Sequence, residues 1–391
     1  MTQKQPNDFG FPDFNHSIVN IAATLADFLG HPTGNPILPN LAEKLKTDYK
    51  NIVYIVIDAM GLRILEKNLP ADSFFRQHQI DTVTSVFPST TAAATTSLIS
   101  ALTPAEHGWF AWSVDFNGTV FELFRNRDYY THEILATDDF AKTHLPYQKF
   151  FDNVTREWEI YSCLPDKISS KIHTPHETEF HTLGQMFRCL HQICQKPGQK
   201  FIYNYYSDLD ATIHAYGTTA WRSRHLLRKI EHKVQRLAKR HPDTLFVITA
   251  DHGQIDVNGF AYICDDTALQ DCLAHPVSLD PRGICFKLKP GKDAAFQTAF
   301  QKYLPDFALY PTKDLIQHGV FGTFKLHPEY QKYLGDYIAI GKDTNKMMVF
   351  NSGDQYQNSK RKRLYRGMHT GLTPDEMYVP LIVINGDKPN A

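Results

Sequence analysis

Acidic and imidazole side chains directly follow three short apolar runs of the sequence, at the positions where buried strands would end. The runs are 51–57, 201–206 and 244–249, and the side chains that follow them are Asp58, Asp210, His214, Asp251 and His252. Ligands of open α/β sheets bind beyond the carboxyl ends of the parallel strands, so these groups would converge on one edge. A carboxylate buried there needs a partner to offset its lost hydration. The pattern therefore predicts a site for divalent cations.

The mixture of carboxylates and imidazoles favours Zn²⁺ and also suits Mn²⁺ or Fe²⁺. In the segment from Asp210 to His214 a turn can direct both side chains at one ion, and Gly253 after His252 lets the backbone turn away. An Asp-His-Gly triplet alone is common, and an aspartate after a strand is often only a helix cap. The joint occurrence of these groups at successive strand ends favours the metal site over that simpler interpretation.

A candidate nucleophile lies in segment 87–100, where Pro88 interrupts a strand and an alanine-rich run begins a helix. Thr90 or Thr91 would then stand near the helix cap. A hydroxyl at this position meets free backbone N–H groups and the positive end of the helix dipole, which favour an alkoxide. A neighbouring metal ion would lower the pKa of the hydroxyl further. These residues alone leave open both the choice of threonine and a purely capping role.

The elements that must position these groups follow an alternating pattern of strands and helices. Besides the three runs above, 378–384 is typical of a buried strand, and 220–240 has apolar residues at helical spacing. The alternation predicts an α/β fold with a mostly parallel central sheet sandwiched by helices. Residues 256–343 mix short strands with a helix at 293–303, which indicates a small α+β cap insertion. We therefore expect a catalytic core formed by 1–255 and 344–391.

Composition excludes several classes of partner. The 41 basic and 42 acidic residues nearly cancel, so we expect no nucleic-acid partner, and the basic run 360–363 is interpreted as a solvated turn. No segment approaches the roughly 20 apolar residues that span a membrane, and the first twenty residues lack a secretory pattern. The six cysteines form no Cys-x-x-Cys pair. We therefore expect a cytoplasmic protein with reduced thiols, no membrane contact and a small-molecule substrate.

The ordered motifs resemble the alkaline phosphatase superfamily, and most closely its type I phosphodiesterase/nucleotide pyrophosphatase branch. In that branch a Pro-x-x-Thr segment opens a helix and a Pro-x-x-His-Gly motif follows, as in 88–91 and 104–108 here. The spacing between these two motifs selects Thr91 over Thr90. The resemblance covers residues from about 50 to 385, through 88–91, 104–108, Asp58, Asp210-x-x-x-His214-x-x-Gly217, Asp251-His252-Gly253 and Gly367-Met-His369-Thr-Gly371.

The resemblance implies a set of ligands for two metal ions. One ion would be held by Asp210, His214 and His369. The other would be held by Asp58, Asp251 and His252, with Thr91 bound to it as the nucleophile. His369 enters the set only through the resemblance. The implied reaction is attack of the threonine on phosphorus to give a covalent phosphothreonine, which water then hydrolyses.

Two positions depart from the pattern of this branch. Its pyrophosphatases carry an aromatic residue after the nucleophile and an asparagine four residues after the His-Gly pair, where this sequence has Ala92 and Trp112. The oxyanion would then be held by the backbone N–H of Thr91 or by a basic residue such as Arg125 or Arg127. The expected function is hydrolysis of phosphodiester or pyrophosphate bonds. The alternatives are a phosphomonoesterase with the same two metals and a non-catalytic metal-binding relative.

Overall fold

A seven-stranded sheet forms the centre of the chain, in the order β2-β18-β9-β1-β8-β6-β7. The computed structural model describes residues 9–134, 140–152, 154–166, 172, 174–322, 326, 328–342, 345–350 and 365–385; the basic run 360–363 lies outside them. The strands are β1 (Asn51–Ile57), β2 (Gln79–Thr84), β6 (Glu159–Pro165), β7 (His176–Phe180), β8 (Lys200–Tyr206), β9 (Thr244–Thr249) and β18 (Tyr378–Asn385). Strands β9, β1, β8, β6 and β7 are parallel, and β18 runs antiparallel to β9 and β2.

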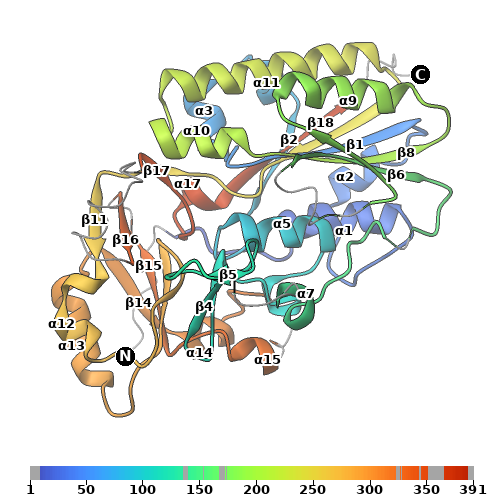
Figure 1. Cartoon of the computed structure of the whole chain (residues 1–391). Coiled ribbons are helices and arrows are strands. Elements are labelled where there is room, and N and C mark those ends of the chain that lie inside the picture. The colour runs from blue at the N-terminus through green and yellow to red at the C-terminus, as the bar shows by residue number, and fades with distance from the viewer. Residues whose placement is uncertain are drawn as a thin grey trace.

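Helices cover both faces of this sheet (Figure 1). One face carries α3 (Leu62–Asn68), α9 (Leu183–Gln195), α10 (Asp208–Tyr216) and α11 (Trp221–Arg240). The other carries α1 (Ile18–Phe28) and α5 (Thr91–Ser100), which pack against each other. Because the inner strands are covered on both sides, every residue of β1, β8 and β9 is buried. The predicted α/β class with a mostly parallel sheet is confirmed.

The segment expected to form a cap contains a second sheet, which is antiparallel and ordered β12-β13-β15-β14. Its strands are β12 (Ser278–Asp280), β13 (Gly283–Phe286), β14 (Phe307–Pro311) and β15 (Tyr337–Gly341), and α13 (Asp293–Tyr303) packs on it through Phe296 and Phe300. A small parallel pair joins β11 (Gly259–Tyr262) to β16 (Lys346–Val349). Figure 1 shows these elements grouped away from the central sheet. The division into core and cap stays a prediction.

A three-stranded antiparallel sheet that the sequence patterns did not predict packs against β12 of the second sheet. Its strands are β3 (Ser113–Phe116), β4 (Thr119–Glu122) and β5 (Arg127–Asp128). The short strands β10 (Ile255–Asp256) and β17 (Gly367–Met368) form one more pair. The remaining helices are α2 (Pro39–Lys44), α4 (Phe74–Gln77), α6 (Pro104–His107), α7 (Phe140–His144), η1 (Ile263–Asp265), α12 (Thr267–Gln270), α14 (Thr312–Gln317), α15 (Pro328–Gln331) and α17 (Pro374–Met377). Among the described residues, no helix has the length and hydropathy needed to span a bilayer.

A buried ion pair connects the second sheet to the loop that carries His369. Arg282, between β12 and β13, donates from Nε to Glu376 Oε1 of α17 at 2.7 Å, and neither side chain is exposed. Glu376 in turn accepts from the backbone N–H groups of Gly371 and Thr373 at 2.9 and 3.2 Å. The same carboxylate therefore holds both the guanidinium and the loop that follows His369.

Candidate metal centre and active site

The first cluster of predicted ligands consists of Asp58, Asp251 and His252, which follow the neighbouring strands β1 and β9. One ligand atom from each lies within 4.8 Å of the others. His252 Nε2 is 3.5 Å from Asp58 Oδ1 and 3.5 Å from Asp251 Oδ2. The Ala59 N–H donates to Asp251 Oδ1 at 3.0 Å, which ties the ends of the two strands together. All three side chains are buried.

The second cluster lies on α10 and the loop after β17. Asp210 and His214 occupy the first and last turns of α10, which begins directly after β8. Asp210 Oδ1 is 3.2 Å from His214 Nε2 and 3.7 Å from His369 Nε2. Asp210, His252 and His369 also place one ligand atom each within 4.8 Å of the others, and the rings of His252 and His369 stack at 3.8 Å. His252 therefore lies between the two clusters.

All three imidazoles have the same orientation relative to the backbone. The Nδ1 atoms of His214, His252 and His369 donate to the carbonyl oxygens of Gly367, Gly253 and Ser89 at 2.8, 3.1 and 2.8 Å. A carbonyl only accepts, so the proton of each neutral ring sits on Nδ1. Each Nε2 then faces the cluster with a free lone pair. This second contact is the arrangement that orients histidine ligands of metals.

The charges of the site also fit a cation. Burial raises the pKa of Asp58 well above its usual value, and the carboxylates of Asp251 and Asp210 raise it further. Burial raises the pKa of Asp251 to about 6, and it lowers the pKa values of His252 and His369 to about 4 and 3. Asp58 Oδ1 has no hydrogen-bond partner in the described part of the chain. The neutral imidazoles of His252 and His369, together with the carboxylates of Asp58 and Asp251 that repel each other, are donors that a divalent cation satisfies.

Two buried polar residues that the sequence did not reveal donate hydrogen bonds to the carboxylates of the two clusters. The hydroxyl of Tyr205, at the end of β8, donates to Asp58 Oδ2 and lies 3.4 Å from Asp251 Oδ2. Gln254 Nε2 donates to the Asp210 carboxylate. Tyrosine is common in strands and glutamine is common in loops, so nothing in the sequence marked these two residues as part of the site. Only the pairing of β1 with β8 and β9 brings Tyr205 to both acids.

The structure separates the two candidate nucleophiles. Thr90 is the N-cap of α5, and its side chain hydrogen-bonds the carboxyl of Asp280 in β12. Thr91 is the first residue of the helix, and its Oγ1 lies 3.3 Å from His252 Nε2. The hydroxyl of Thr91 thus faces the ligand clusters, whereas that of Thr90 is engaged by the second sheet.

The suggestion that Arg125 or Arg127 holds the oxyanion stays a prediction, and the structure places both arginines beside Glu122. Arg125 Nη1 lies 3.3 Å from Glu122 Oε1, and Arg127 Nε donates to the other carboxylate oxygen. Arg125 also lies over the ring of Trp112, 5.2 Å from its centroid. Neither arginine lines the pocket at Thr91. Residue order alone did not show that these two guanidinium groups lie beside one buried acid.

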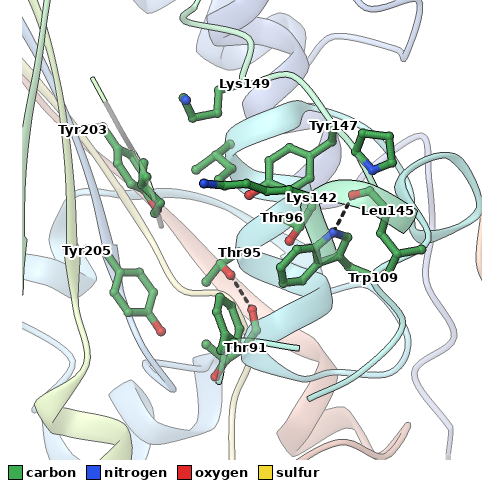
Figure 2. Close-up of a pocket in the computed structure, with 14 residues that line it drawn as sticks. Thr91, Thr95, Thr96, Trp109, Lys142, Leu145, Tyr147, Lys149, Tyr203 and Tyr205 are labelled. Carbon is green, nitrogen blue, oxygen red and sulfur yellow. Dashed lines mark hydrogen bonds between the residues drawn. The ribbon is translucent and has the colours of Figure 1, made fainter. Parts of the chain in front are cut away.

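A pocket of about 240 Å³ opens at Thr91 and continues along α5 (Figure 2). Thr91, Thr95 and Ile99 line it from the helix, and Tyr203 and Tyr205 line it from β8. The remaining lining residues are Thr96, Trp109, Phe124, Lys142, Leu145, Pro146, Tyr147, Lys149 and Ile172. Ala92 is not among them; it is buried in the core cluster that also contains Phe87. The site therefore combines a hydroxyl, two ligand clusters and an adjoining pocket.

Comparison with known proteins finds solved structures of similar fold. No curated protein sequence matches the chain. The structure of murine ectonucleotide pyrophosphatase/phosphodiesterase 5 is similar, with a TM-score of 0.61 at 14% identity over 84% of this chain and 87% of that chain. Phosphonoacetate hydrolase from Sinorhizobium meliloti 1021, in complex with phosphonoformate, has a TM-score of 0.61 at 15% identity over 88% and 92% of the two chains. At these low sequence identities, the similarity shows a shared fold alone.

The family itself is shown by the sequence. The profile of the family described as type I phosphodiesterase/nucleotide pyrophosphatase matches residues 52–303, well over half of the chain. This stretch begins in β1 and contains Thr91 and every predicted ligand except His369. The chain belongs to the type I phosphodiesterase/nucleotide pyrophosphatase family, a family of metal-dependent hydrolases.

Proposed function

We propose that the chain hydrolyses phosphodiester or pyrophosphate bonds at a site for two divalent metal ions, with Thr91 as the nucleophile. The observation that supports this most strongly is the position of the Thr91 hydroxyl. It lies 3.3 Å from His252, which is shared by the two groups of potential metal ligands, and it stands at the start of α5. The N–H groups of a first helical turn have no partners within the helix, which favours an anionic substrate there.

The residues present suit two cations, and Zn²⁺ is the ion we propose, because imidazole and carboxylate form its usual ligand set. Asp58, Asp251 and His252 would hold one ion together with Thr91. Asp210, His214 and His369 would hold the other. When bound, the ions supply positive charge to the entering and leaving oxygens of an in-line displacement.

The chain's own residues account for the remaining steps. Thr91 Oγ1 forms a bond to phosphorus while the bond to the leaving oxygen breaks, and the threonine gives up its proton as the leaving group takes one up. Water then attacks the phosphorus of this covalent intermediate and breaks its bond to Thr91 Oγ1. The step restores the Thr91 hydroxyl and releases the phosphoryl group with the organic group that it still carries, which is a phosphate monoester. The N-terminal turn of α5 faces the negative charge on the phosphoryl oxygens throughout.

The relatives support a small phosphorus-containing substrate. An inactive variant of the murine relative, in which one threonine is changed to alanine, was solved in complex with AMP. The Sinorhizobium meliloti hydrolase was solved with phosphonoformate and with phosphonoacetate. These ligands share a phosphate or phosphonate group on a small organic anion, which is the chemistry we propose for the present site.

Replacing Thr91 tests the proposal, and its neighbour provides the control. T91A should lower kcat by roughly 10³-fold or more, because the displacement loses its nucleophile. T90A removes the same hydroxyl one residue earlier, where it contacts Asp280 rather than the ligand clusters, and should retain most activity. Hydrolysis of bis-p-nitrophenyl phosphate measures both. Equal activities of T91A and T90A would overturn the assignment.

Chelation and substrate choice test the other two parts of the proposal. Prolonged EDTA treatment should abolish hydrolysis, because it removes the cations that supply positive charge to the reacting oxygens. Added Zn²⁺ should restore hydrolysis. The rates on bis-p-nitrophenyl phosphate and p-nitrophenyl phosphate then distinguish a diesterase from a monoesterase. A large excess for the monoester would contradict the diesterase proposal.

A further inference from the structure

The helix α11 carries a high positive charge in a chain whose basic and acidic residues are almost equal in number. Its 20 residues include one acid, Glu231, whose carboxylate accepts a hydrogen bond from the Phe75 N–H at 2.8 Å. Its basic residues are Arg222, Arg224, Arg228, Lys229, Lys233, Arg236, Lys239 and Arg240. The near-zero net charge, from which we expected no nucleic-acid partner, therefore hides a concentration of positive charge on one element.

The charged side of α11 faces solvent. Leu227 and Val234 belong to the buried stripe that packs against the rest of the fold. Six of the basic residues are exposed, namely Arg222, Arg228, Lys229, Arg236, Lys239 and Arg240. Among the ion pairs of the described residues, none includes a basic residue of this helix. The positive charge of α11 is thus open to an external anion.

A line of ring side chains runs along the outermost part of this helix. Successive residues of a helix are about 100° apart, which places Trp221, His225 and His232 opposite the buried stripe. Trp221 is 72% exposed, and its ring stacks on that of His225 at 5.0 Å. These rings divide the exposed face into two sides.

Basic residues lie on both sides of the ring line. One side faces α4, where Glu231 meets the Phe75 N–H, and it carries Arg224, Arg228 and Lys239. The other side faces α9, where Lys233 Nζ lies 5.6 Å from the centroid of the Phe187 ring. This second side carries Arg222, Lys229, Lys233, Arg236 and Arg240. The two rows of cations are therefore about one helix diameter apart, or about 10–12 Å, over a length of about 30 Å.

The width between the two rows indicates the kind of polyanion that fits. The major groove of B-form DNA is about 12 Å wide, admits an α-helix and has a phosphate backbone on either side. The major groove of A-form RNA is too narrow for side chains to read. A membrane would receive the apolar side of an amphipathic helix, whereas that side of α11 is buried in the fold. Charge and width together match duplex DNA.

We propose that the exposed face of α11 binds double-stranded DNA through its phosphate groups. Phosphate contacts carry no sequence information, so the binding should not depend on base sequence. Figure 1 shows α11 on the opposite side of the central sheet from α5, which carries Thr91. The DNA is therefore a partner held outside the pocket at Thr91, and the inference is independent of the proposed hydrolysis.

The salt dependence of binding tests the proposal, because each phosphate contact releases condensed counterions. The probe is a fluorescently labelled DNA duplex of about 20 base pairs, whose anisotropy is measured with the full-length chain at 50 to 200 mM NaCl. If each of the six exposed cations meets one phosphate, the affinity should fall about 10³-fold over this range. R228Q/K229Q/R236Q leaves three contacts, so its affinity should fall only about 40-fold. Glutamine keeps the helix propensity of these positions.

A second triple variant provides the matched control. K292Q/K302Q/K313Q removes three exposed lysines at α13 and α14 and changes the net charge equally, so it should keep the full salt dependence. Thermal unfolding followed by circular dichroism checks that both variants are folded. No binding of the duplex at 50 mM NaCl, or the same salt dependence in both triple variants, would overturn the proposal. Equally strong binding of phosphatidylglycerol vesicles or of duplex RNA would overturn the choice of DNA.

Discussion

The hydroxyl of Tyr205 provides a quantitative test of how the metal ligands are held. Replacing Tyr205 with phenylalanine removes one oxygen and keeps the buried ring. A phenol has one proton, which serves the close contact to Asp58, and the 3.4 Å contact to Asp251 is weak. The Tyr205→Phe variant therefore loses about one hydrogen bond, from the phenol to the Asp58 carboxylate. Such supporting contacts typically change metal affinity by about 10–100-fold, or about 1.4–2.7 kcal/mol.

The assay is competition for Zn²⁺ between the metal-free protein and a chromophoric chelator. Y205F should bind Zn²⁺ about 10–100-fold more weakly than the unmodified protein. Y203F is the matched control, because the Tyr203 hydroxyl is equally buried on the same strand and has no hydrogen-bond partner among the described residues. It should leave Zn²⁺ affinity within about twofold. If Y205F and Y203F bind Zn²⁺ equally well, the tyrosine does not orient the ligands.

Two further predictions concern stability. R282M should lower the free energy of unfolding by about 3–5 kcal/mol, because it leaves the buried Glu376 carboxylate without its partner. In urea unfolding, R282M/E376L should lose less stability than R282M and E376L lose when their separate effects are added. Burial lowers the pKa of His107 to about 3, which is below its value of about 6.5 in the unfolded chain. Between these two pH values the imidazole is protonated only in the unfolded state, so the free energy of unfolding decreases as the pH drops below about 6.5. His107 Nδ1 accepts a hydrogen bond from the Trp109 N–H at 3.0 Å. Because glutamine does not titrate, H107Q should remove about 2 kcal/mol of the change in unfolding free energy between pH 7 and pH 5. Urea unfolding at both pH values measures this change, and an unchanged pH dependence in H107Q would contradict the reasoning.

Much of the core could be predicted because its strands are buried on both faces. The continuous apolar runs of β1, β8 and β9 are the signature of inner parallel strands, and their ends give the positions of Asp58 and Asp251. The helix at 221–240 shows its buried stripe of Leu227, Ile230, Val234 and Leu237. These elements depend on local patterns that a single sequence contains.

The remaining parts of the site depend on tertiary contacts that have no local signature. His369 follows β17, a strand of only two residues, so no apolar run announces it and the family resemblance alone supplied it. Tyr205 and Gln254 act on the carboxylates only because neighbouring strands and loops bring them there. Arg125 and Arg127 looked available in the sequence, but Glu122 engages both.

The central claim is a site for two metal ions beside Thr91, and anomalous X-ray scattering at the zinc absorption edge tests it most directly. Crystals grown with Zn²⁺ should show two separate anomalous peaks. One peak should lie among Asp58, Asp251 and His252 within bonding distance of Thr91 Oγ1, and the other should lie beside Asp210 and His369. A single peak, or peaks away from these residues, would contradict the account.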